Sequence, residues 1–320
     1  MQIEYTDAIN FLMNCDDAYI LTHQSPDGDT IGSAFALCYL LKELGKRSKI
    51  ICPDGLPERY NFMYTDYEEA DFEPDCIIAV DIADPKLLGK YREVYGDKVN
   101  LCIDHHYSNI LYAEKTLLNA HAGATCEIIY RLINLADIRC SDMMARCLYT
   151  GIATDTGCFK FENTTAETHR IVAEMMDNNH IEYAKINRLM FDIKSPARLR
   201  VERLAFDATE FYFDGKCAFM PVTEKMLEEN NITSNDLEGV ATLPLQIEGV
   251  EVGVTLRERE ANVFKVSMRS SGKADVSLIA GKLGGGGHIR ASGCLMKGEL
   301  PEVRKKILSV IETAVKEQDL

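Results

Sequence analysis

Short apolar runs alternate with amphipathic segments through the first half of this chain. Runs with the length and composition of buried strands lie at residues 18–23, 48–52, 76–80 and 99–103. Between and after them, apolar residues recur at helical spacing, and this alternation is typical of a mainly parallel sheet flanked by helices. We therefore expect an α/β domain over residues 1–190.

Helical spacing places three helices of this domain at residues 33–44, 124–136 and 141–153. The residues around the start of the first, QSPDGDTIGS, are rich in turn formers and are expected to form a loop. A further helix is expected to end near Asp177, with Asn163 or Thr164 as its N-cap.

The pattern changes near residue 190. Pro196 falls where a helix can begin, so residues 191–207 are expected to form a connecting helix. The elements expected after it are a hairpin around Asp214-Gly215, strands at 249–257 and 261–269 with a turn at 258–260, and a helix at 276–283. Together they predict a smaller, mixed α/β domain over residues 208–320.

Side chains that bind metal ions follow four of the apolar elements. They are His23, Asp27 and Asp29 after the first run, Asp81 after the third, Asp104, His105 and His106 after the fourth, and Asp155 after the helix at 141–153. In open α/β folds, ligands bind at the carboxyl ends of the strands. A carboxylate after one strand is more often a helix cap or turn residue, but recurrence at four elements indicates a metal centre.

The residue types narrow the identity of the ion. Carboxylates and imidazoles without thiolates favour Mn²⁺, with Mg²⁺, Co²⁺ and Fe²⁺ as competitors. Even six ligands from this set exceed what one catalytic ion needs and suit two ions that share carboxylates. Such a pair activates a water molecule and stabilises the attacking and leaving oxygens of a phosphoryl transfer. We therefore expect two divalent ions.

Composition excludes several partners. A net charge of −15 leaves no basic track for long duplex nucleic acid. No apolar run approaches the ~20 residues of a membrane-spanning helix, so no membrane partner is expected. The eleven cysteines include no CxxC pair, and several lie in apolar runs, so we expect a reducing, cytoplasmic location without a disulfide framework. A homodimer is left open.

A second informative stretch, GKLGGGGHIRASGCLM, occupies residues 281–296. A four-glycine run is usually a flexible linker, but this one lies between a helix and a strand inside a domain. Backbone without side chains lets a phosphate or base approach closely, and His288 and Arg290 can donate to an anion. On the residues alone, binding and linker remain equal alternatives.

Four stretches, HQSPDGDTIGS, VDIAD, DHH and TGIATDTGCF, occur in the order of the four motifs of the DHH phosphoesterase superfamily, which the chain resembles over nearly its whole length. The resemblance implies a two-metal, typically manganese, centre. Its implied ligands are His23, Asp27, Asp29, Asp81, His105 and Asp155, with Asp81 and Asp155 as bridges. It also implies that His106 contacts the scissile phosphate and that Asp104 orients a neighbouring histidine.

The GGGGH stretch resembles the motif of the DHHA1 domain, which follows the DHH domain in one branch of the superfamily. This implies that the second domain holds the nucleotide while the first does the chemistry, with the active site in the cleft between them. The implied substrate-binding residues are Gly284, Gly285, Gly286, Gly287 and His288, with Arg269 as a phosphate contact and Ser270 as a further candidate. Arg290 is a candidate from its chemistry alone.

Size, acidity and domain pairing are most similar to the stand-alone branch of nanoRNases and pAp phosphatases. That branch degrades very short oligoribonucleotides to 5′-mononucleotides and converts 3′-phosphoadenosine 5′-phosphate (pAp) to AMP, so we expect short RNA and nucleotides as substrates. Linear or cyclic dinucleotides are an alternative at the same site. A pyrophosphatase of the superfamily is disfavoured because its second domain differs, and a non-catalytic nucleotide sensor because no implied ligand is missing.

Overall fold

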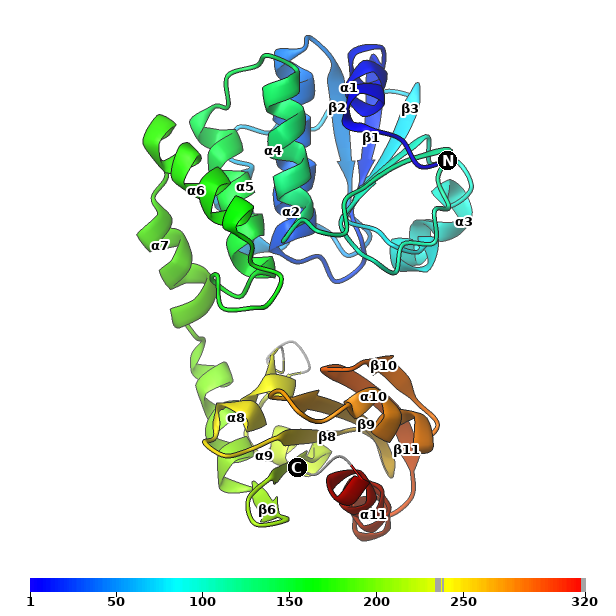
Figure 1. Cartoon of the computed structure of the whole chain (residues 1–320), viewed down its shortest axis with the longest axis vertical. Helices are drawn as coiled ribbons and strands as arrows, with labels where there is room; N and C mark the ends of the chain where they lie inside the picture. The colour runs from blue at the N-terminus through cyan, green and yellow to red at the C-terminus, as the bar shows by residue number, and fades with distance from the viewer. Residues whose placement is uncertain (234–236, 238, 318–320) are drawn as a thin grey trace. The chain divides into compact units, whose positions relative to one another are not determined.

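The computed structural model describes residues 1–233, 237 and 239–317, and the chain divides into two compact units, Met1–Ile193 and Lys194–Leu320 (Figure 1). Each unit has its own sheet and its own core. Residues 318–320, the end of the second domain expected from the sequence, lie outside the described residues. Within the described part of the chain, no helix is long and apolar enough to cross a membrane.

A five-stranded parallel sheet forms the centre of the first unit, with the strand order β2-β1-β3-β4-β5. Its strands are β1 (Asp17–Leu21), β2 (Arg47–Ile51), β3 (Cys76–Val80), β4 (Leu101–Asp104) and β5 (Lys115–Leu118). Ile20 of β1 pairs with Ile50 of β2 on one side and with Ile78 of β3 on the other. The predicted parallel α/β architecture is thus confirmed.

Helices cover both faces of this sheet (Figure 1). The longer ones are α1 (Tyr5–Met13), α2 (Gly28–Glu43), α4 (Thr125–Leu135), α5 (Asp142–Asp155) and α6 (Ala166–Asn178), and shorter ones are α3 (Arg92–Tyr95) and α7 (Tyr183–Asn187). Successive residues of a strand point to opposite faces of the sheet. Accordingly, Ile78 and Val80 pack among the longer helices, while Ile77 and Ala79 pack on the opposite side.

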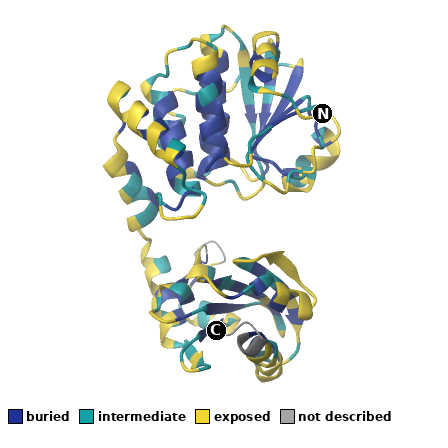
Figure 2. Cartoon of the chain, viewed as in Figure 1, coloured by how far each residue is buried: buried dark blue, intermediate teal, exposed yellow. Residues whose placement is uncertain are grey.

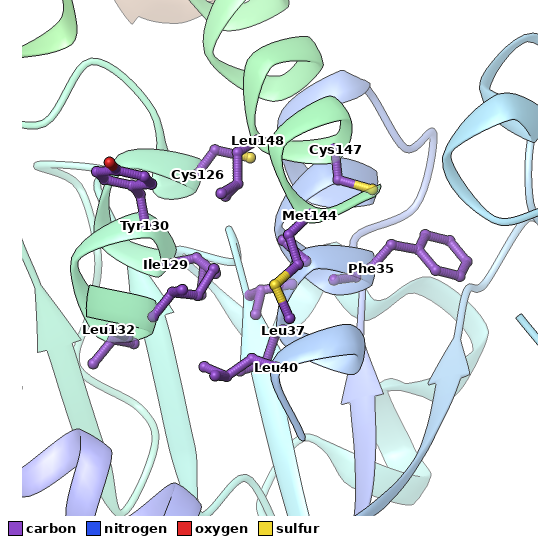
Figure 3. Close-up of a cluster of buried hydrophobic side chains, with 14 of the residues drawn as sticks. Phe35, Leu37, Leu40, Cys126, Ile129, Tyr130, Leu132, Met144, Cys147 and Leu148 are labelled. Atoms are coloured by element: carbon purple, nitrogen blue, oxygen red, sulfur yellow. The ribbon is translucent and has the colours of Figure 1, made fainter. Parts of the chain in front are cut away.

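Helix α2 lies at the centre of the larger core, and all of its residues from Gly28 to Leu41 are buried (Figure 2). Helices α4 and α5 pack against it, and Figure 3 shows side chains of all three in one cluster, among them Leu37, Ile129 and Met144. A helix that is apolar on every side is stable only when surrounded in this way. Its packing fixes the N-terminus of α2 beside the sheet.

Two helix starts differ from the sequence prediction. Helix α2 begins at Gly28 rather than at residue 33, because the Asp27 side chain accepts hydrogen bonds from the backbone N–H groups of Asp29 and Thr30 and caps it. Helix α6 is capped by Thr165, whose hydroxyl accepts from the backbone N–H of Thr168, and not by Asn163 or Thr164. The DGD triplet is therefore a cap and a first turn rather than a loop.

One disulfide joins Cys15 to Cys76, and the other nine cysteines are free. The sequence predicted no disulfide framework, and it did not anticipate this single bond. Cys38, Cys102, Cys126 and Cys147 are buried in the first unit, where each acts as a small apolar side chain.

A six-stranded mixed sheet forms the second unit, with the strand order β10-β11-β9-β8-β7-β6. Its strands are β6 (Glu210–Tyr212), β7 (Cys217–Val222), β8 (Val252–Glu260), β9 (Val263–Ser270), β10 (Gly286–His288) and β11 (Ala291–Lys297). Among these six described strands, β7 and β8 pair in parallel and the other neighbours pair antiparallel. Val254 and Val266 share a core with Ile279 of α10 (Val276–Lys282) and Ile307 of α11 (Leu300–Glu317).

Three features of the second unit sharpen or correct the prediction. The hairpin around Asp214-Gly215 is confirmed by the antiparallel pair β6 and β7. Strand β8 continues through Glu260, so the turn lies at residues 261–262 rather than 258–260, and Asn262 in it adopts a left-handed φ of 62°. Helix α8 (Pro196–Asp207), in the segment expected to connect the domains, packs on β7 within the second unit, and α9 (Glu224–Glu229) follows β7.

Candidate metal centre

The carboxyl edge of the parallel sheet gathers the metal-type residues of the first unit. His23 follows β1, Asp81 follows β3, and His105 and His106 follow β4. Their possible ligand atoms form three groups, within each of which all lie within 4.8 Å of one another: His23, Asp27 and Asp81; Asp29, His105 and Asp155; and Asp81, His105 and His106. The structure therefore brings together all six residues that the sequence singled out as ligands, and His106 with them.

Asp81 and His105 each belong to two of these groups, and Asp81 is the carboxylate that does so. Its Oδ2 lies 3.6 Å from His23 Nε2, and its Oδ1 lies 3.7 Å from His105 Nε2. The Thr125 hydroxyl donates to Oδ1 at 2.9 Å. Asp81 has a φ of 62°, a left-handed conformation that a residue other than glycine adopts only when its surroundings hold it there. Asp81 is buried just after β3, and its two carboxylate oxygens face different histidines.

Asp29 is fixed by the start of helix α4. Its two oxygens accept hydrogen bonds from the backbone N–H groups of Thr125, at 2.7 Å, and Cys126, at 3.0 Å. These N–H groups have no partners within their own helix, and they favour a negative charge at this position. Asp29 is fully buried, so its carboxylate is aimed by the backbone and not by solvent.

His105 has one ring nitrogen engaged and one available. Its Nδ1 lies 3.1 Å from the Ala122 carbonyl oxygen, which can only accept, so Nδ1 carries the proton. Its Nε2 is buried, lies 3.5 Å from Asp155 Oδ2 and 3.9 Å from Asp29 Oδ2, and has no hydrogen-bond partner among the described residues. A buried nitrogen that faces carboxylates without a hydrogen bond to them fits a ligand of a cation placed between them.

Burial and repulsion disturb the titration of these groups. The pKa of Asp29 is raised well above its usual range, by burial first and then by neighbouring carboxylates. Burial raises the pKa of Asp155 to about 6, and the charge of Asp81 acts in the same direction. Burial disfavours the charged form of His23, but Asp27 and Asp81 outweigh it and raise its pKa to about 11. This excess of negative charge fits divalent cations.

Asp104 holds His106 and belongs to none of the three groups of possible ligands. Its Oδ1 accepts from His106 Nδ1 at 2.8 Å and from the backbone N–H groups of His105 and His106. Its Oδ2 accepts from the Asn109 amide at 2.6 Å. Burial alone would raise the pKa of Asp104, but the contacts with His106 and Asn109 lower it. Asp104 is therefore an ionised anchor for the loop after β4.

A groove of about 550 Å³ crosses the sheet of the second unit. Of the residues implied in substrate binding, it is lined by Arg269, Gly286 and Gly287, and it also contains Arg259 and Lys265, which the sequence did not single out. Within the described part of the chain, none of these three cations forms an ion pair. Burial lowers the pKa of Lys265, and the neighbouring arginines act in the same direction. Unpaired cations in a groove suit an anionic ligand.

The remaining candidates of the second unit do not line this groove. Arg290 donates to the Ser270 hydroxyl at 3.4 Å and to the Ala274 carbonyl at 3.3 Å, so the two candidates are engaged with each other. Gly284 and Gly285 precede β10, and a Cβ at Gly285 would lie 2.1 Å from the Gly293 carbonyl oxygen. Gly286 and Gly287 belong to the edge strand β10, and Gly285 and Gly287 approach the backbone of β11 closely, so the run is part of the sheet rather than a linker.

Two family descriptions match this chain, "DHH family, N-terminal domain" over residues 17–152 and "DHHA1 domain" over residues 215–317. The bifunctional oligoribonuclease and PAP phosphatase NrnA of Thermus thermophilus is 34% identical over 301 residues, which are 92% of this chain and 88% of that protein. The chain belongs to the DHH phosphoesterase family. Its metal-dependent phosphoester chemistry and its DHH–DHHA1 pairing, both expected from the motifs, are thereby confirmed.

Two other relatives of this DHH phosphoesterase extend the comparison. An exopolyphosphatase-related protein from Bacteroides fragilis has a solved structure with a TM-score of 0.85 and 27% identity, covering 98% of this chain and 96% of that one. A probable manganese-dependent inorganic pyrophosphatase of Lactobacillus acidophilus is 23% identical over 209 residues, 62% of this chain and 67% of that protein. The likeness in fold to the first therefore extends through both domains.

Several residues that shape the DHH centre escaped the sequence analysis. Thr125 and Cys126 aim Asp29 and Asp81, and the Asn163 amide donates to Asp155 Oδ2 at 3.3 Å and to the Gly123 carbonyl at 2.8 Å. In the sequence, these residues could be noticed only as polar side chains at the start of a helix or in a loop. Such residues also serve as caps, so their contacts with the centre emerge only from the fold.

Proposed function

We propose that this DHH phosphoesterase hydrolyses short oligoribonucleotides to 5′-mononucleotides and dephosphorylates pAp to AMP. The supporting observation is the convergence of seven metal- and phosphate-type side chains in a chain that matches an oligoribonuclease and PAP phosphatase over 92% of its length. Both reactions break a phosphoester bond to a ribose hydroxyl, so one centre can serve both.

Two divalent ions, with Mn²⁺ preferred, complete the centre in this proposal. We assign one ion to His23 and Asp27, the other to Asp29, His105 and Asp155, and the bridge to Asp81. The two oxygens of Asp81 face His23 and His105, as a bridge requires. The resemblance implies Asp155 as a second bridge; we place it among the ligands of the ion at His105, whose Nε2 lies 3.5 Å from Asp155 Oδ2. Oxygen and imidazole donors suit Mn²⁺, and the pyrophosphatase relative carries manganese in its name.

When bound, such a pair of ions supplies an activated water molecule and offsets phosphate charge. The residues of the chain supply position. Because Asp104 engages His106 Nδ1, Nε2 is the ring nitrogen left to donate to an oxygen of the scissile phosphate. Thr125 holds Asp81, and the start of α4 holds Asp29, so the donors are in place before substrate arrives.

We assign nucleotide binding to the DHHA1 domain. In this assignment Arg269 contacts a phosphate, while the backbone of Gly286 and Gly287 allows close approach of the nucleotide in the same groove. We also assign Gly284, Gly285 and His288 of the GGGGH stretch to the nucleotide, with Ser270 and Arg290, which hydrogen-bond to each other, as further candidates. The unpaired charges of Arg259 and Lys265 support an anionic, nucleotide-sized substrate.

A substrate panel with Mn²⁺ tests this function. The purified chain should hydrolyse a diribonucleotide and pAp faster than cyclic dinucleotides or pyrophosphate, and Asp81→Ala should abolish both activities. Asp97→Ala, which removes an exposed carboxylate elsewhere in the same domain, is the matched control and should change neither. Binding without turnover of any substrate would identify a sensor, and a preference for pyrophosphate would overturn the proposed substrate class.

A further inference from the structure

Tyr107 directly follows the phosphate-contacting candidate His106 and is 93% exposed, more than any other large apolar side chain that the structure describes. Single exposed apolar residues are common on protein surfaces and need no function. Two features separate Tyr107 from them: the rigidity of its loop and the apolar character of its surroundings.

The backbone that carries Tyr107 is held at both ends. The Asn109 backbone N–H donates to the His106 carbonyl at 3.0 Å, and the Asn109 side chain donates to Asp104 at 2.6 Å. Beyond it, the Ile110 N–H donates to the Ala83 carbonyl at 3.0 Å. A ring on a backbone fixed in this way loses little further freedom when a ligand binds, so its contacts add efficiently to affinity.

The same loop exposes further apolar surface beside the metal centre. Ile110 is 59% exposed and Leu111 is 43% exposed, and Leu111 is held by its N–H, which donates to the Asn109 side chain at 2.7 Å. Ile110 and Leu111 follow His106 by four and five residues, so this apolar surface belongs to the same loop as the proposed phosphate contact. A simple phosphate or pyrophosphate has no apolar part that could use it, whereas a nucleotide has a base.

We propose that Tyr107 stacks against a base of the nucleotide substrate and is a positioning and specificity residue of the DHH domain. The proposal rests on the proposed function and deepens it, because it explains how a centre that binds only phosphate prefers phosphates attached to a nucleoside. The Cα atoms of His106 and Tyr107 are about 3.8 Å apart, so one short, hydrogen-bonded loop carries both the proposed phosphate contact and the ring. Base–aromatic stacking tolerates every base, as a short-RNA hydrolase requires.

The test compares pAp with ribose 3,5-bisphosphate, which carries the same two phosphates but no base. Tyr107→Ala should raise the KM for pAp by about tenfold, with little change in kcat, and leave the KM for the baseless compound unchanged. Tyr107→Phe keeps the ring and should retain the wild-type KM. Tyr183→Ala removes a 46% exposed tyrosine of α7 and is the matched control, for which no change is expected. Equal effects of Tyr107→Ala on both compounds, or no effect on either, would overturn the proposal.

A binding measurement separates this proposal from the proposed function. With Mn²⁺ present, calorimetric titration should show that the wild type binds AMP more tightly than ribose 5-phosphate and that Tyr107→Ala removes most of this difference. If the wild type turned over neither RNA nor pAp yet showed this pattern, the function would fail while the stacking role stood. If Tyr107→Ala kept the full preference for AMP, the stacking role would fail whatever the activity.

Discussion

His106 donates from Nδ1 to Asp104 Oδ1 at 2.8 Å, and the same carboxylate oxygen accepts the backbone N–H groups of His105 and His106. One buried carboxylate thus fixes the ring and the backbone of the residue that we assign to the phosphate. The contact also raises the pKa of His106 to about 9, against the effect of its burial. We therefore expect Asp104 to act on the reaction through this histidine.

Replacing Asp104 with Asn tests that relationship. The amide can present an N–H where the carboxylate accepts, so the His106 ring should lose its orientation while its neighbours stay in place. We expect kcat for pAp to fall by about 10–100-fold, the range for residues that orient metal-site groups. Mn²⁺ content, measured by elemental analysis of the purified variant, should stay at the wild-type value. A parallel loss of metal would show that Asp104 holds the ions themselves.

Gly151 on α5 allows that helix to approach α2 and α4 beside the centre. A Cβ at this position would lie 2.2 Å from Cys126 Sγ and 3.0 Å from Asp29 Oδ1. Gly151→Ala should therefore lower the free energy of unfolding by about 1–3 kcal/mol, measured by urea denaturation, and reduce activity by displacing Asp29. Gly281→Ala in α10 is the control: its Cβ meets nothing within 4 Å, so helix propensity alone should raise stability slightly.

Metal binding should stabilise the folded DHH domain, because its clustered carboxylates repel one another and the unfolded chain has no such site. At a Mn²⁺ concentration 100-fold above its Kd, one site contributes about 2.7 kcal/mol. Calorimetry should show a higher Tm in Mn²⁺ than in EDTA, with a smaller rise for His105→Ala. His180→Ala, which removes an exposed imidazole, should keep the full rise. Identical Tm values in Mn²⁺ and EDTA would count against the centre.

Arg259 and Lys265 extend the DHHA1 groove beyond Arg269 and should favour longer substrates. Each replacement by Ala should raise the KM for a pentaribonucleotide about threefold to tenfold, with less effect on pAp, which has fewer phosphates. Each lost phosphate contact should reduce the salt dependence of log KM by about 0.7 per decade of salt. Lys225→Ala on α9 supplies the control. Equal changes in KM for both substrates would show that the two cations do not favour longer substrates.

Much of the fold could be predicted because buried parallel strands are nearly continuous apolar runs, as in β1 and β3. Strand β5 escaped, since Lys115 and Thr116 interrupt its pattern. The residues of the centre could be singled out because few other roles place histidines and aspartates at successive strand ends. The sequence prediction started α2 too late, because Asp27 and Gly28 are residue types that are common in turns. That they form the cap and first turn of a helix is seen only in the folded structure, where this helix is buried. Contacts such as that of Thr125 with Asp81 exist only across the fold.

Glu202 of α8 makes a pH-dependent contribution to the stability of the second unit. It is 8% exposed and accepts from Lys194 Nζ at 2.7 Å and from Arg198 Nε at 2.9 Å. Burial alone would raise its pKa, but these two cations lower it below the usual value of 4.5. The unfolded chain therefore binds the proton more readily, so the contribution is present above pH 4.5 and is lost as the pH falls through the folded pKa.

Glu202→Gln should consequently lower the free energy of unfolding by about 1–2 kcal/mol at pH 7, because both cations lose a partner in a partly buried place. The difference from the wild type should shrink between pH 5 and pH 3, where the native carboxylate also becomes protonated. Hydrogen exchange of the α8 backbone amides, measured in the full chain, reports the local stability of this helix at each pH. Glu248→Gln, at an exposed position of the same unit, should show no difference at any pH. If the loss in free energy of unfolding caused by Glu202→Gln stayed constant with pH, the shape of the Glu202 side chain, and not its charge, would account for its role.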